Sequence, residues 1–304
     1  MATSKYTFAS FKAEYPNDDA CLEAIIQRRY VVAPACHGCG VVPTKFHRIT
    51  GRRAYACQWC GHHVYPCAGT PFEHSSTPLT LWFHAMYLMT ATRNGVSAKE
   101  LQRQLGVTYK CAWRIGHELR KLMAARDKMN NPTPLKGHVE IDETYVGGRH
   151  RGTRGRGAQG KTVVFGLLER QGAVKGHVVP NVTRATLRPI IEANVQKGSK
   201  VSTDEFRTYK NLKKMGYKHG VVSHGIEEYV KGIHHVNSVE GFWSHLKRGI
   251  SSTHVSVSGK YLQNYVNEFG FRYNNRKDPA EMFHRMLGQI ARATPSAHST
   301  QGSH

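Results

Sequence analysis

Four cysteines in two close pairs constrain the fold of this chain more than any other feature. Cys36 and Cys39 are separated by two residues, as are Cys57 and Cys60, and seventeen residues lie between the pairs. A glycine follows each pair, in CHGCG and CQWCG, and permits the tight turn of a metal-binding knuckle. We expect the four thiolates to bind one structural Zn²⁺ in a zinc ribbon, because four cysteines leave no open coordination position for chemistry.

A pair of disulfides is the alternative use of these four cysteines. The N-terminal stretch MATSKYTFASFKAEYP lacks the apolar segment of a secretory signal. We therefore expect the chain to stay in a reducing cytoplasm, where thiolates bind zinc. Cys21 and Cys111 stand alone, and we expect them to be small core residues. Other side chains could substitute as zinc ligands at a less regular spacing: His37, His62, His63 and Cys67.

The charge of the chain indicates a polyanionic partner. Lysine and arginine total 43 against 21 aspartates and glutamates, which gives a net charge of +22. That excess is far more than solubility requires. A membrane is the competing partner, yet no segment approaches the roughly 20 consecutive apolar residues that span a bilayer, so we expect no membrane association. Structural RNA would explain the charge equally well.

Two segments after the cysteines have the pattern of a helical DNA-binding module. LTLWFHAMYLMT, residues 79–90, is an apolar helix, and a helix-turn-helix pattern follows it. Leu101 and Leu105 face inward, Gly106 permits the turn, and Thr108 caps the second helix. Such helix pairs are common in proteins that never touch DNA, but the ribbon and the net charge favour DNA recognition here. The side chains offered to a DNA groove are Tyr109, Lys110, Arg114 and His117.

The segment HVNSVEGFWSHLKRGI, residues 235–250, separates into an apolar and a polar face when wound as a helix. Glu240 and Lys247 share the polar face, since seven residues at about 100° each end only about 20° from the starting direction. That spacing suits a metal-binding carboxylate in line with a phosphate-binding ammonium group. A solvated face with a chance Glu/Lys pair is the alternative. The apolar face consists of Val239, Phe242, Trp243, Leu246 and Ile250.

Two further carboxylates lie on or beside predicted strands. HVEIDETYVGG, residues 138–148, alternates like a strand and contains Asp142, while Asp204 ends the β-prone run KVSTD before the helical pattern FRTYKNLKKMGY. A buried, unpaired carboxylate is costly, and a divalent cation would compensate it. Three carboxylates near basic residues match the needs of Mg²⁺, which takes hard oxygen ligands and the phosphate of a substrate.

The ordered motifs of this chain resemble those of the DDE superfamily of transposases. Asp142, Asp204 and Glu240 have the order and local contexts of its acidic triad, with 35 residues between the last two. Five segments are similar to motifs of the ISXO-type insertion-sequence transposases: GTPFEHSSTPLTLWFHAMYLM, VEIDETYVGGR, STDEFRTY, HVNSVEGFWSHLKRG and NEFGFRYNNRK. The resemblance covers most of residues 31–277.

This resemblance implies an RNase H-like mixed sheet flanked by helices, and a site for two Mg²⁺ or Mn²⁺ ions. Asp142, Asp204 and Glu240 would be the metal ligands, and Lys247 would contact a phosphate near the cut. Members of the group have either Glu or Asn at the third position, and Asn237 lies on the same helix face as Glu240. Charge favours Glu240, because a neutral amide oxygen binds Mg²⁺ less strongly.

A Gly/Arg-rich stretch, GGRHRGTRGRGAQGK, follows the strand that bears Asp142. Its composition cannot bury a core, so a disordered, solvated loop is one interpretation. Because a flexible basic loop beside a nuclease-like site can neutralise several phosphates, we favour contact with the DNA backbone. The residues expected to contact DNA in and beyond this loop are Arg151, Arg154, Arg156, Lys161, Lys247 and Arg248.

We therefore expect a multidomain α/β protein. Further strands are predicted at 162–169 and 173–182, and a helix at 186–196. The expected parts are an N-terminal helical segment (1–30), the zinc ribbon (31–68), the helix-turn-helix domain (75–126), a linker (127–137), the RNase H-like catalytic domain (138–290) and a disordered tail (291–304).

The expected function is that of a DNA transposase in a bacterial or archaeal cytoplasm. It would bind double-stranded DNA at the ends of an insertion sequence and at the target, cleave and join strands with its metal ions, and act as a dimer or higher oligomer in the synaptic complex. Two alternatives remain. A DNA-binding regulator would explain the first 130 residues but not the acidic triad, and a metal-dependent nuclease of the same fold would use every catalytic residue.

Overall fold

The computed structural model describes residues 6–30, 35–36, 38–42, 45–130, 134–147, 160–222 and 232–290. These residues divide into two compact units, which are described separately. Unit 1 comprises the chain up to Thr92, Ala98–Leu122 and the residues from Asp278 onward, and unit 2 comprises Arg93–Ser97 and Met123–Lys277.

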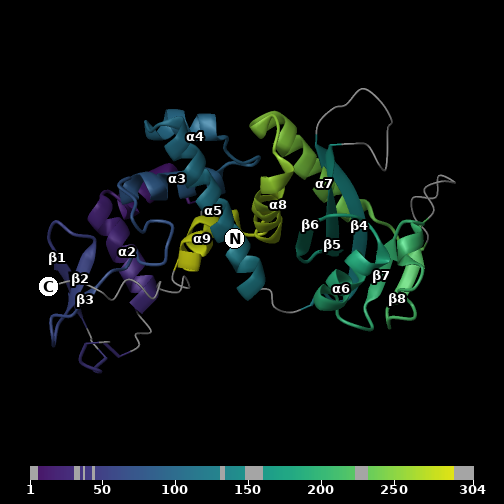
Figure 1. Ribbon diagram of the computed structural model, residues 1–304, viewed down its shortest axis with the longest axis horizontal. Helices are drawn as coiled ribbons and strands as arrows, with labels where there is room; N and C mark the ends of the chain where they lie inside the picture. The colour runs from purple at the N-terminus through teal and green to yellow at the C-terminus, as the bar shows by residue number, and fades with distance from the viewer. Residues whose placement is uncertain are drawn as a thin grey trace. The chain divides into compact units, whose positions relative to one another are not determined.

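Unit 1 combines a small antiparallel sheet with helices from both ends of the chain (Figure 1). The sheet has the order β1-β2-β3 and corresponds to the expected ribbon. The elements of this unit are α1 (Phe8–Glu14), α2 (Asp18–Tyr30), β1 (Phe46–Ile49), β2 (Ala54–Cys57), β3 (His63–Val64), α3 (Leu79–Ala91), α4 (Ala98–Leu105), most of α5 (Tyr109–Asn130), η4 (Pro279–Glu281) and α9 (Met282–Ile290).

Helix α2 joins the ribbon to the helical part of unit 1. The carboxylate of Asp18 accepts the backbone N–H groups of Leu79 and Thr80, both at 2.9 Å, and so caps the start of α3 from outside that helix. On the ribbon side, the Tyr55 hydroxyl donates to Glu23 at 2.7 Å. Helix α2 is therefore hydrogen-bonded both to β2 of the ribbon and to the start of α3.

The predicted helix pair is present as α4 and α5. Leu101 and Leu105 are buried, as expected for its inner face. Gly106 has φ +65° between the two helices, a conformation that favours glycine. The Thr108 hydroxyl accepts the N–H of Cys111 at 3.3 Å and caps α5. The expected turn chemistry is confirmed at both positions.

Unit 2 is built on a mixed sheet with the strand order β6-β5-β4-β7-β8. Strand β4 pairs antiparallel with β5 and parallel with β7. This sheet, flanked by helices, confirms the expected RNase H-like α/β fold class. Its elements are β4 (His138–Gly147), β5 (Lys161–Glu169), β6 (Val174–Val179), α6 (Arg184–Asn194), β7 (Lys200–Thr203), η1 (Arg207–Tyr209), β8 (Lys218–Val221), α7 (Asn237–Gly249), η3 (Ile250–His254) and α8 (Gly259–Asn274).

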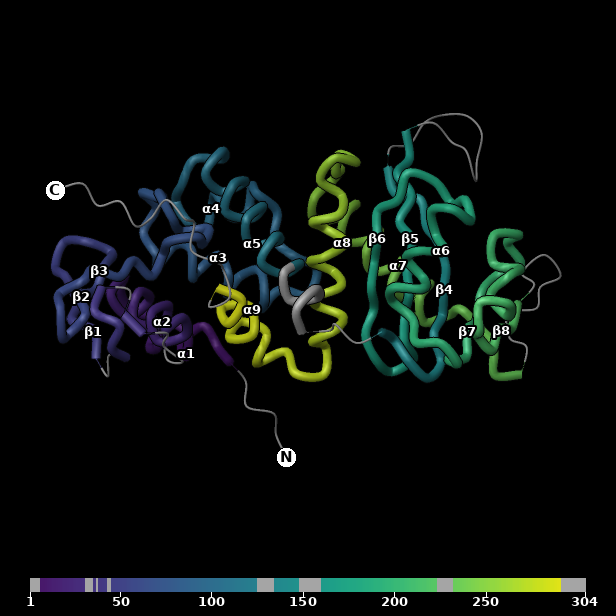
Figure 2. The backbone as a smooth tube through the Cα atoms, turned by 60° about the horizontal axis from the view of Figure 1, so that its bottom comes forward, coloured from purple at the N-terminus to yellow at the C-terminus, as the bar shows by residue number. Residues whose placement is uncertain are grey.

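The two faces of this sheet carry separate apolar cores. Leu187 and Ile191 of α6 pack with Ile141 and other side chains of one face. On the opposite face α7 and α8 cover the sheet, and Figure 2 shows α8 alongside the edge strand β6. Because alternate residues of a strand point to opposite faces, Asp142 shares the α7 face with Val146.

The apolar face predicted for α7 is confirmed side chain by side chain. Its members are all buried in one cluster with residues of β5, β6 and α8. Glu240 and Lys247 are exposed beside this apolar face. The helix is thus anchored by its apolar face and presents its charged face outward.

Three segments differ from the sequence-based expectation. Helix α5, expected to end by residue 126, continues to Asn130, and 134–137 belongs to unit 2 through the hydrogen bond from Leu135 N–H to Asn194 O (2.7 Å). The stretch after Asp204 forms a 3₁₀ helix, Arg207–Tyr209, and successive turns instead of an α-helix.

Helix α9, expected in the catalytic domain, packs against α3 and α2 in unit 1. The expected tail, 291–304, lies outside the described residues.

Among the described residues, no helix is long and apolar enough to cross a bilayer.

Two glycines of α7 allow the packing of this helix to be tested. A Cβ at Gly249 would lie 2.1 Å from Phe269 Cζ of α8, whereas a Cβ at Gly241 would meet nothing within 4 Å. We expect Gly249→Ala to lower the free energy of unfolding by about 1–3 kcal/mol through overpacking. The matched Gly241→Ala should be neutral or stabilising by up to about 1 kcal/mol, because alanine favours the helix. Urea denaturation followed by circular dichroism measures both, and equal effects would contradict this account of the α7–α8 contact.

Candidate active site and metal centre

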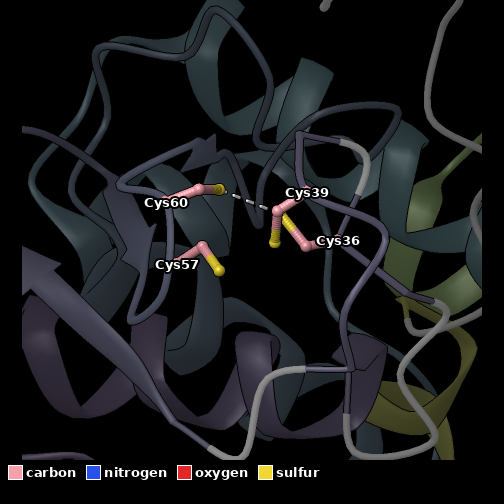
Figure 3. Close-up of side chains that lie close together, drawn as sticks. All are labelled: Cys36, Cys39, Cys57 and Cys60. Atoms are coloured by element: carbon pink, nitrogen blue, oxygen red, sulfur yellow. Dashed lines mark hydrogen bonds between the residues drawn. The ribbon is translucent and has the colours of Figure 1, made fainter.

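The four predicted zinc ligands converge in the ribbon. Figure 3 shows the side chains of the two cysteine pairs turned toward one another, and their sulfur atoms all lie within 4.8 Å of each other. The sulfur atoms of Cys36 and Cys60 are 3.7 Å apart. Four sulfurs at about 2.3 Å from a tetrahedral zinc ion would be about 3.8 Å apart. The cysteines therefore fit a structural Zn²⁺.

The two knuckles have the same backbone geometry. Gly40 N–H donates to Cys36 O at 2.8 Å with φ +71°, and Gly61 N–H donates to Cys57 O at 3.0 Å with φ +72°. Both glycines occupy the left-handed region that the sequence motif requires. In the second knuckle, backbone N–H groups of Cys60 and Trp59 lower the pKa of the Cys57 thiol to about 7, which favours the thiolate form.

Asp142 lies in the middle of β4 and reaches α7. It is paired in register with Gly166 of β5. A Cβ at Gly166 would lie 2.4 Å from Trp243 Cζ2, so only glycine leaves room for the indole ring of α7 at this point. The Trp243 indole N–H donates to Asp142 Oδ2 at 3.0 Å. Gly166 and Trp243 were not identified from the sequence as site residues; the strand register is what shows their role.

The environment of Asp142 is electrostatically unfavourable for an isolated carboxylate. Burial, followed by the neighbouring charges of Glu143 and Asp204, raises the pKa of Asp142 to about 7. Within the described chain, no lysine, arginine or histidine forms an ion pair with Asp142. Glu143 accepts a hydrogen bond from the Tyr209 hydroxyl at 2.6 Å. A bound cation would compensate Asp142, so the residues fit a divalent metal.

Asp204 directly follows β7, as the sequence predicts, and interacts electrostatically with Asp142. Its Oδ1 accepts the N–H of Phe206 at 3.1 Å, which shapes the turn that leaves the strand. The Thr203 hydroxyl donates to Asp204 O at 2.7 Å. The structure therefore brings the first two predicted acids together at neighbouring strands.

The third acid lies on α7, next to the contact with Asp142. Glu240 precedes Trp243 by three residues and Lys247 follows it by four, so both are neighbours of Trp243 on the helix surface. Asn237 is the first residue of α7, a further turn away. Among the described residues, the cysteines are the one group of three or more potential ligands gathered tightly enough for an ion. Glu240 is exposed and does not complete such a group with the two aspartates.

Glu140 anchors the start of α7 and was not singled out from the sequence. It is fully buried, two residues before Asp142 on the same face of β4. Its carboxylate accepts the backbone N–H groups of Ser238 at 2.8 Å and Val239 at 3.1 Å. The first N–H groups of a helix have no acceptor within the helix, so Glu140 supplies the acceptor that these two need. The helix dipole also favours a negative charge at this end of α7.

Arg170 completes this anchor from the turn after β5. Its Nε donates to Glu140 at 2.6 Å, and its two terminal nitrogens donate to the carbonyl oxygens of Ile233 at 2.7 Å and His235 at 3.0 Å. The segment that leads into α7 is therefore held on the sheet by one buried ion pair. The position of Asn237 and Glu240 relative to Asp142 depends on it.

The residues predicted to bind DNA differ in how exposed their side chains are. Lys110 and Arg114 are exposed on α5, with the Arg114 guanidinium 5.8 Å from the Trp82 ring centre. His117 is half-buried and stacked on Trp113 at 4.8 Å, so its ring is less available to a groove. Lys161 begins β5, and Lys247 and Arg248 are exposed at the end of α7. Arg151, Arg154 and Arg156 lie outside the described residues.

Known proteins share both parts of this architecture. The ISXO2-like transposase domain family matches residues 134–274, and the transposase zinc-ribbon domain family matches residues 16–63. The "Uncharacterized protein in transposable element ISH50" of Halobacterium salinarum is 34% identical over 279 residues, which are 86% of this chain and 91% of that protein. Fold and sequence therefore define a DNA transposase. The chain belongs to the ISXO2-like transposase family, which confirms the resemblance found in its motifs.

Two other similarities are weaker. The "Uncharacterized transposase-like protein" of Haemophilus influenzae is 34% identical over 98 residues, 32% of this chain and 78% of that protein. The crystal structure of a pre-cleavage Mos1 transpososome is 12% identical and covers 69% of this chain and 78% of that chain, with a TM-score of 0.29. A score this low supports no argument, and the fold class stands on the sheet of the chain itself.

The buried anchor of α7 predicts a large effect of one atom change. Glu140→Gln replaces one carboxylate oxygen, an acceptor, by an NH₂ group, a donor. This donor would face the N–H groups of Arg170 and of the α7 backbone, and the charge that pairs with Arg170 would be lost. We therefore expect the free energy of unfolding of unit 2 to fall by about 3–5 kcal/mol. The control is Glu192→Gln, the same substitution at an exposed ion pair with Arg188 on α6. That change should cost less than about 0.5 kcal/mol. Urea denaturation compares the two variants, and similar losses would show that Glu140 does not anchor the helix.

Proposed function

We propose that this transposase uses Asp142, Asp204 and Glu240 to hold two divalent metal ions for strand cleavage and strand transfer at the ends of an insertion sequence. The observation that carries the proposal is the state of Asp142: it is buried beside the charge of Asp204, and no lysine, arginine or histidine in the described part of the chain forms an ion pair with it. A carboxylate in that state is ready for an ion that the protein itself does not supply. A structural acid would be neutralised within the fold, as Glu140 is by Arg170.

The contact between Trp243 and Asp142 supports Glu240 as the third ligand. Trp243 fixes the middle of α7 beside the first aspartate, and Glu240 is one turn from it. Asn237 is about two turns from Trp243 and lacks a charge. We assign Glu240 to the metal, and Asn237 to the positioning of a water molecule or to the rest of a metal shell.

The residues around the acids have separate tasks in this mechanism. When bound, Mg²⁺ or Mn²⁺ activates an attacking water or 3′-hydroxyl and stabilises the leaving oxygen of the phosphodiester. Trp243 holds the Asp142 carboxylate by its indole N–H, which fixes the Oδ2 atom beside α7. Lys247, exposed one turn beyond Trp243, contacts a phosphate of the strand being cut. Cleavage frees a 3′-hydroxyl, which attacks the target strand without a covalent protein intermediate.

DNA recognition in this proposal is divided between the two units. Lys110 and Arg114 of α5 read the ends of the element, while Lys161, Lys247, Arg248 and the arginines of the Gly/Arg stretch contact phosphates. Two ends must be joined to one target, so the active assembly contains at least two copies of the chain. A Zn²⁺ ion bound by the four cysteines keeps the ribbon folded.

Substitution of the acids tests the active site. Asp142→Asn and Asp204→Asn should each abolish cleavage and joining while binding to element ends is kept, because they remove metal ligands without changing the DNA-binding unit. Glu240→Gln should do the same, and Asn237→Ala should keep measurable strand transfer. The assay incubates each variant with element ends, target plasmid and Mg²⁺, and scores cut and joined products separately.

The outcomes of this assay separate the alternatives. An active Glu240→Gln with an inactive Asn237→Ala would reverse the assignment of the third ligand. Cutting without joining by the wild-type protein would favour the metal-dependent nuclease. Binding to the ends without either reaction, with Mg²⁺ or Mn²⁺, would favour the regulator.

Zinc removal tests the ribbon. We expect one Zn²⁺ per chain by native mass spectrometry, and unfolding of the ribbon before unit 2 when a chelator removes it. Cys60→Ser should lose the ion, whereas Cys111→Ser, a change of a cysteine outside the cluster, should retain it. A chain without zinc, or a Cys36–Cys39 disulfide in fresh protein, would contradict the proposed centre.

A further inference from the structure

A hollow of about 440 Å³ lies at the β7–β8 edge of the sheet in unit 2. Three exposed lysines line it: Lys200 at the start of β7, Lys218 at the start of β8, and Lys213 from the turns between these strands. Buried Tyr217 and His219 contribute to its wall. The acidic residues of the proposed active site and the helix pair of unit 1 do not line this hollow.

The charge of the hollow is not compensated by the described part of the protein. No acidic side chain in the described ranges forms an ion pair with Lys200, Lys213 or Lys218, although several arginines elsewhere in unit 2 are paired. Burial and the nearby Lys213 and His234 lower the pKa of His219 to about 4, and burial with Arg170 and Lys200 lowers the pKa of His234. Both rings are therefore neutral near pH 7, and the lysines supply the positive charge.

The wall behind these lysines is held in place by hydrogen bonds. His234 Nδ1 lies 2.8 Å from Ser202 Oγ, and His219 Nε2 lies 2.9 Å from Thr203 Oγ1. A Cβ at Gly220 of β8 would be 2.3 Å from His234 Nε2, so glycine at this position leaves room for the His234 ring. A site formed on strands and fixed rings needs little reorganisation to bind an anion.

We propose that this lysine hollow binds the phosphate backbone of duplex DNA, as a contact surface additional to those of the proposed function, on which this inference rests. Lysine is a point charge without the fork geometry of arginine, which suits phosphate contacts that do not read sequence. Exposed Lys197 and Lys214 extend the same basic segment, so a repeating polyanion matches the surface better than a single free anion.

The position of the hollow suits DNA that also reaches the acidic residues. Lys200 begins β7 and Asp204 directly follows this strand, so at about 3.3 Å per residue the two positions are about 13 Å apart. A helical turn of duplex DNA spans about 34 Å. One duplex can therefore contact the lysines while one of its phosphates lies at Asp142 and Asp204.

The salt dependence of DNA binding tests the hollow. We compare the wild-type chain with the triple variant Lys200→Gln, Lys213→Gln and Lys218→Gln, using duplexes with and without an element end. Three lost phosphate contacts should reduce the slope of log K against log salt by about 2–3 for both duplexes, so that the affinity lost between 50 and 200 mM salt shrinks by roughly 40-fold. The control triple, Lys175→Gln, Lys260→Gln and Lys277→Gln, removes the same charge from unit 2 outside the hollow.

The outcomes distinguish this inference from the proposed function. A wild-type chain without salt-dependent DNA binding would overturn both. If the triple variant kept the wild-type slope of log K against log salt, or if the control triple lost as much slope, the DNA contact at the hollow would be overturned and the proposed function would stand. Acetylation of lysines in the wild-type chain gives a reading free of any folding defect: DNA should protect Lys200, Lys213 and Lys218 more than the control lysines. Protection by millimolar inorganic phosphate but not by DNA would show a free-anion site instead.

Discussion

The arrangement of unit 2 depends on the contacts of one buried carboxylate, that of Glu140. It accepts two backbone N–H groups in the first turn of α7 and a side-chain N–H from Arg170. A buried carboxylate is tolerated when its charge is paired and its oxygens are hydrogen-bonded, and both conditions hold here. Since Glu140 belongs to the same strand as Asp142, the strand that carries the first acid also fixes the helix that carries the third.

A second contact fixes the same helix further along its length. Trp243 lies on Gly166, the residue paired with Asp142, and donates to the Asp142 carboxylate. Two points of attachment, one at the start of α7 and one about two turns later, define both the position and the rotation of a rigid helix. The direction in which Glu240 and Lys247 project is thereby set by contacts that neither residue makes.

Much of this arrangement could be predicted from local sequence patterns. The knuckles, the helix pair and the apolar face of α7 depend on spacing and turn chemistry within a few residues, which the sequence displays directly. The role of Glu140 could not be predicted, because alternation places it on the face of Asp142 without showing what lies opposite. The same holds for Gly166, whose function is to leave space for a ring 77 positions later in the sequence.

The remaining differences also arise from long-range packing. Residues 282–290 have a helical pattern but no signal for the unit that they join, and they pack against α3 and α2. The stretch after Asp204 contains apolar side chains at helix-like intervals, yet Tyr209, Leu212 and Tyr217 are all buried against one face of the sheet. The connection that carries these side chains to the core consists of a 3₁₀ helix and tight turns, with Gly216 at φ +90° before β8.

Glu140 and Asp142 are two acids of one strand, two residues apart, with different environments. Both side chains project toward α7, and both are largely removed from solvent. Glu140 receives a guanidinium and helix amides, so its charge is satisfied within the fold. Asp142 receives neutral donors, the Trp243 indole N–H and the Glu143 backbone N–H, while burial and the charges of Glu143 and Asp204 raise its pKa to about 7. The difference lies in whether the protein provides the cation. Where it does not, a bound metal ion would relieve the unfavourable electrostatic energy, and this is the physical basis for placing the proposed chemistry at Asp142 and not at Glu140.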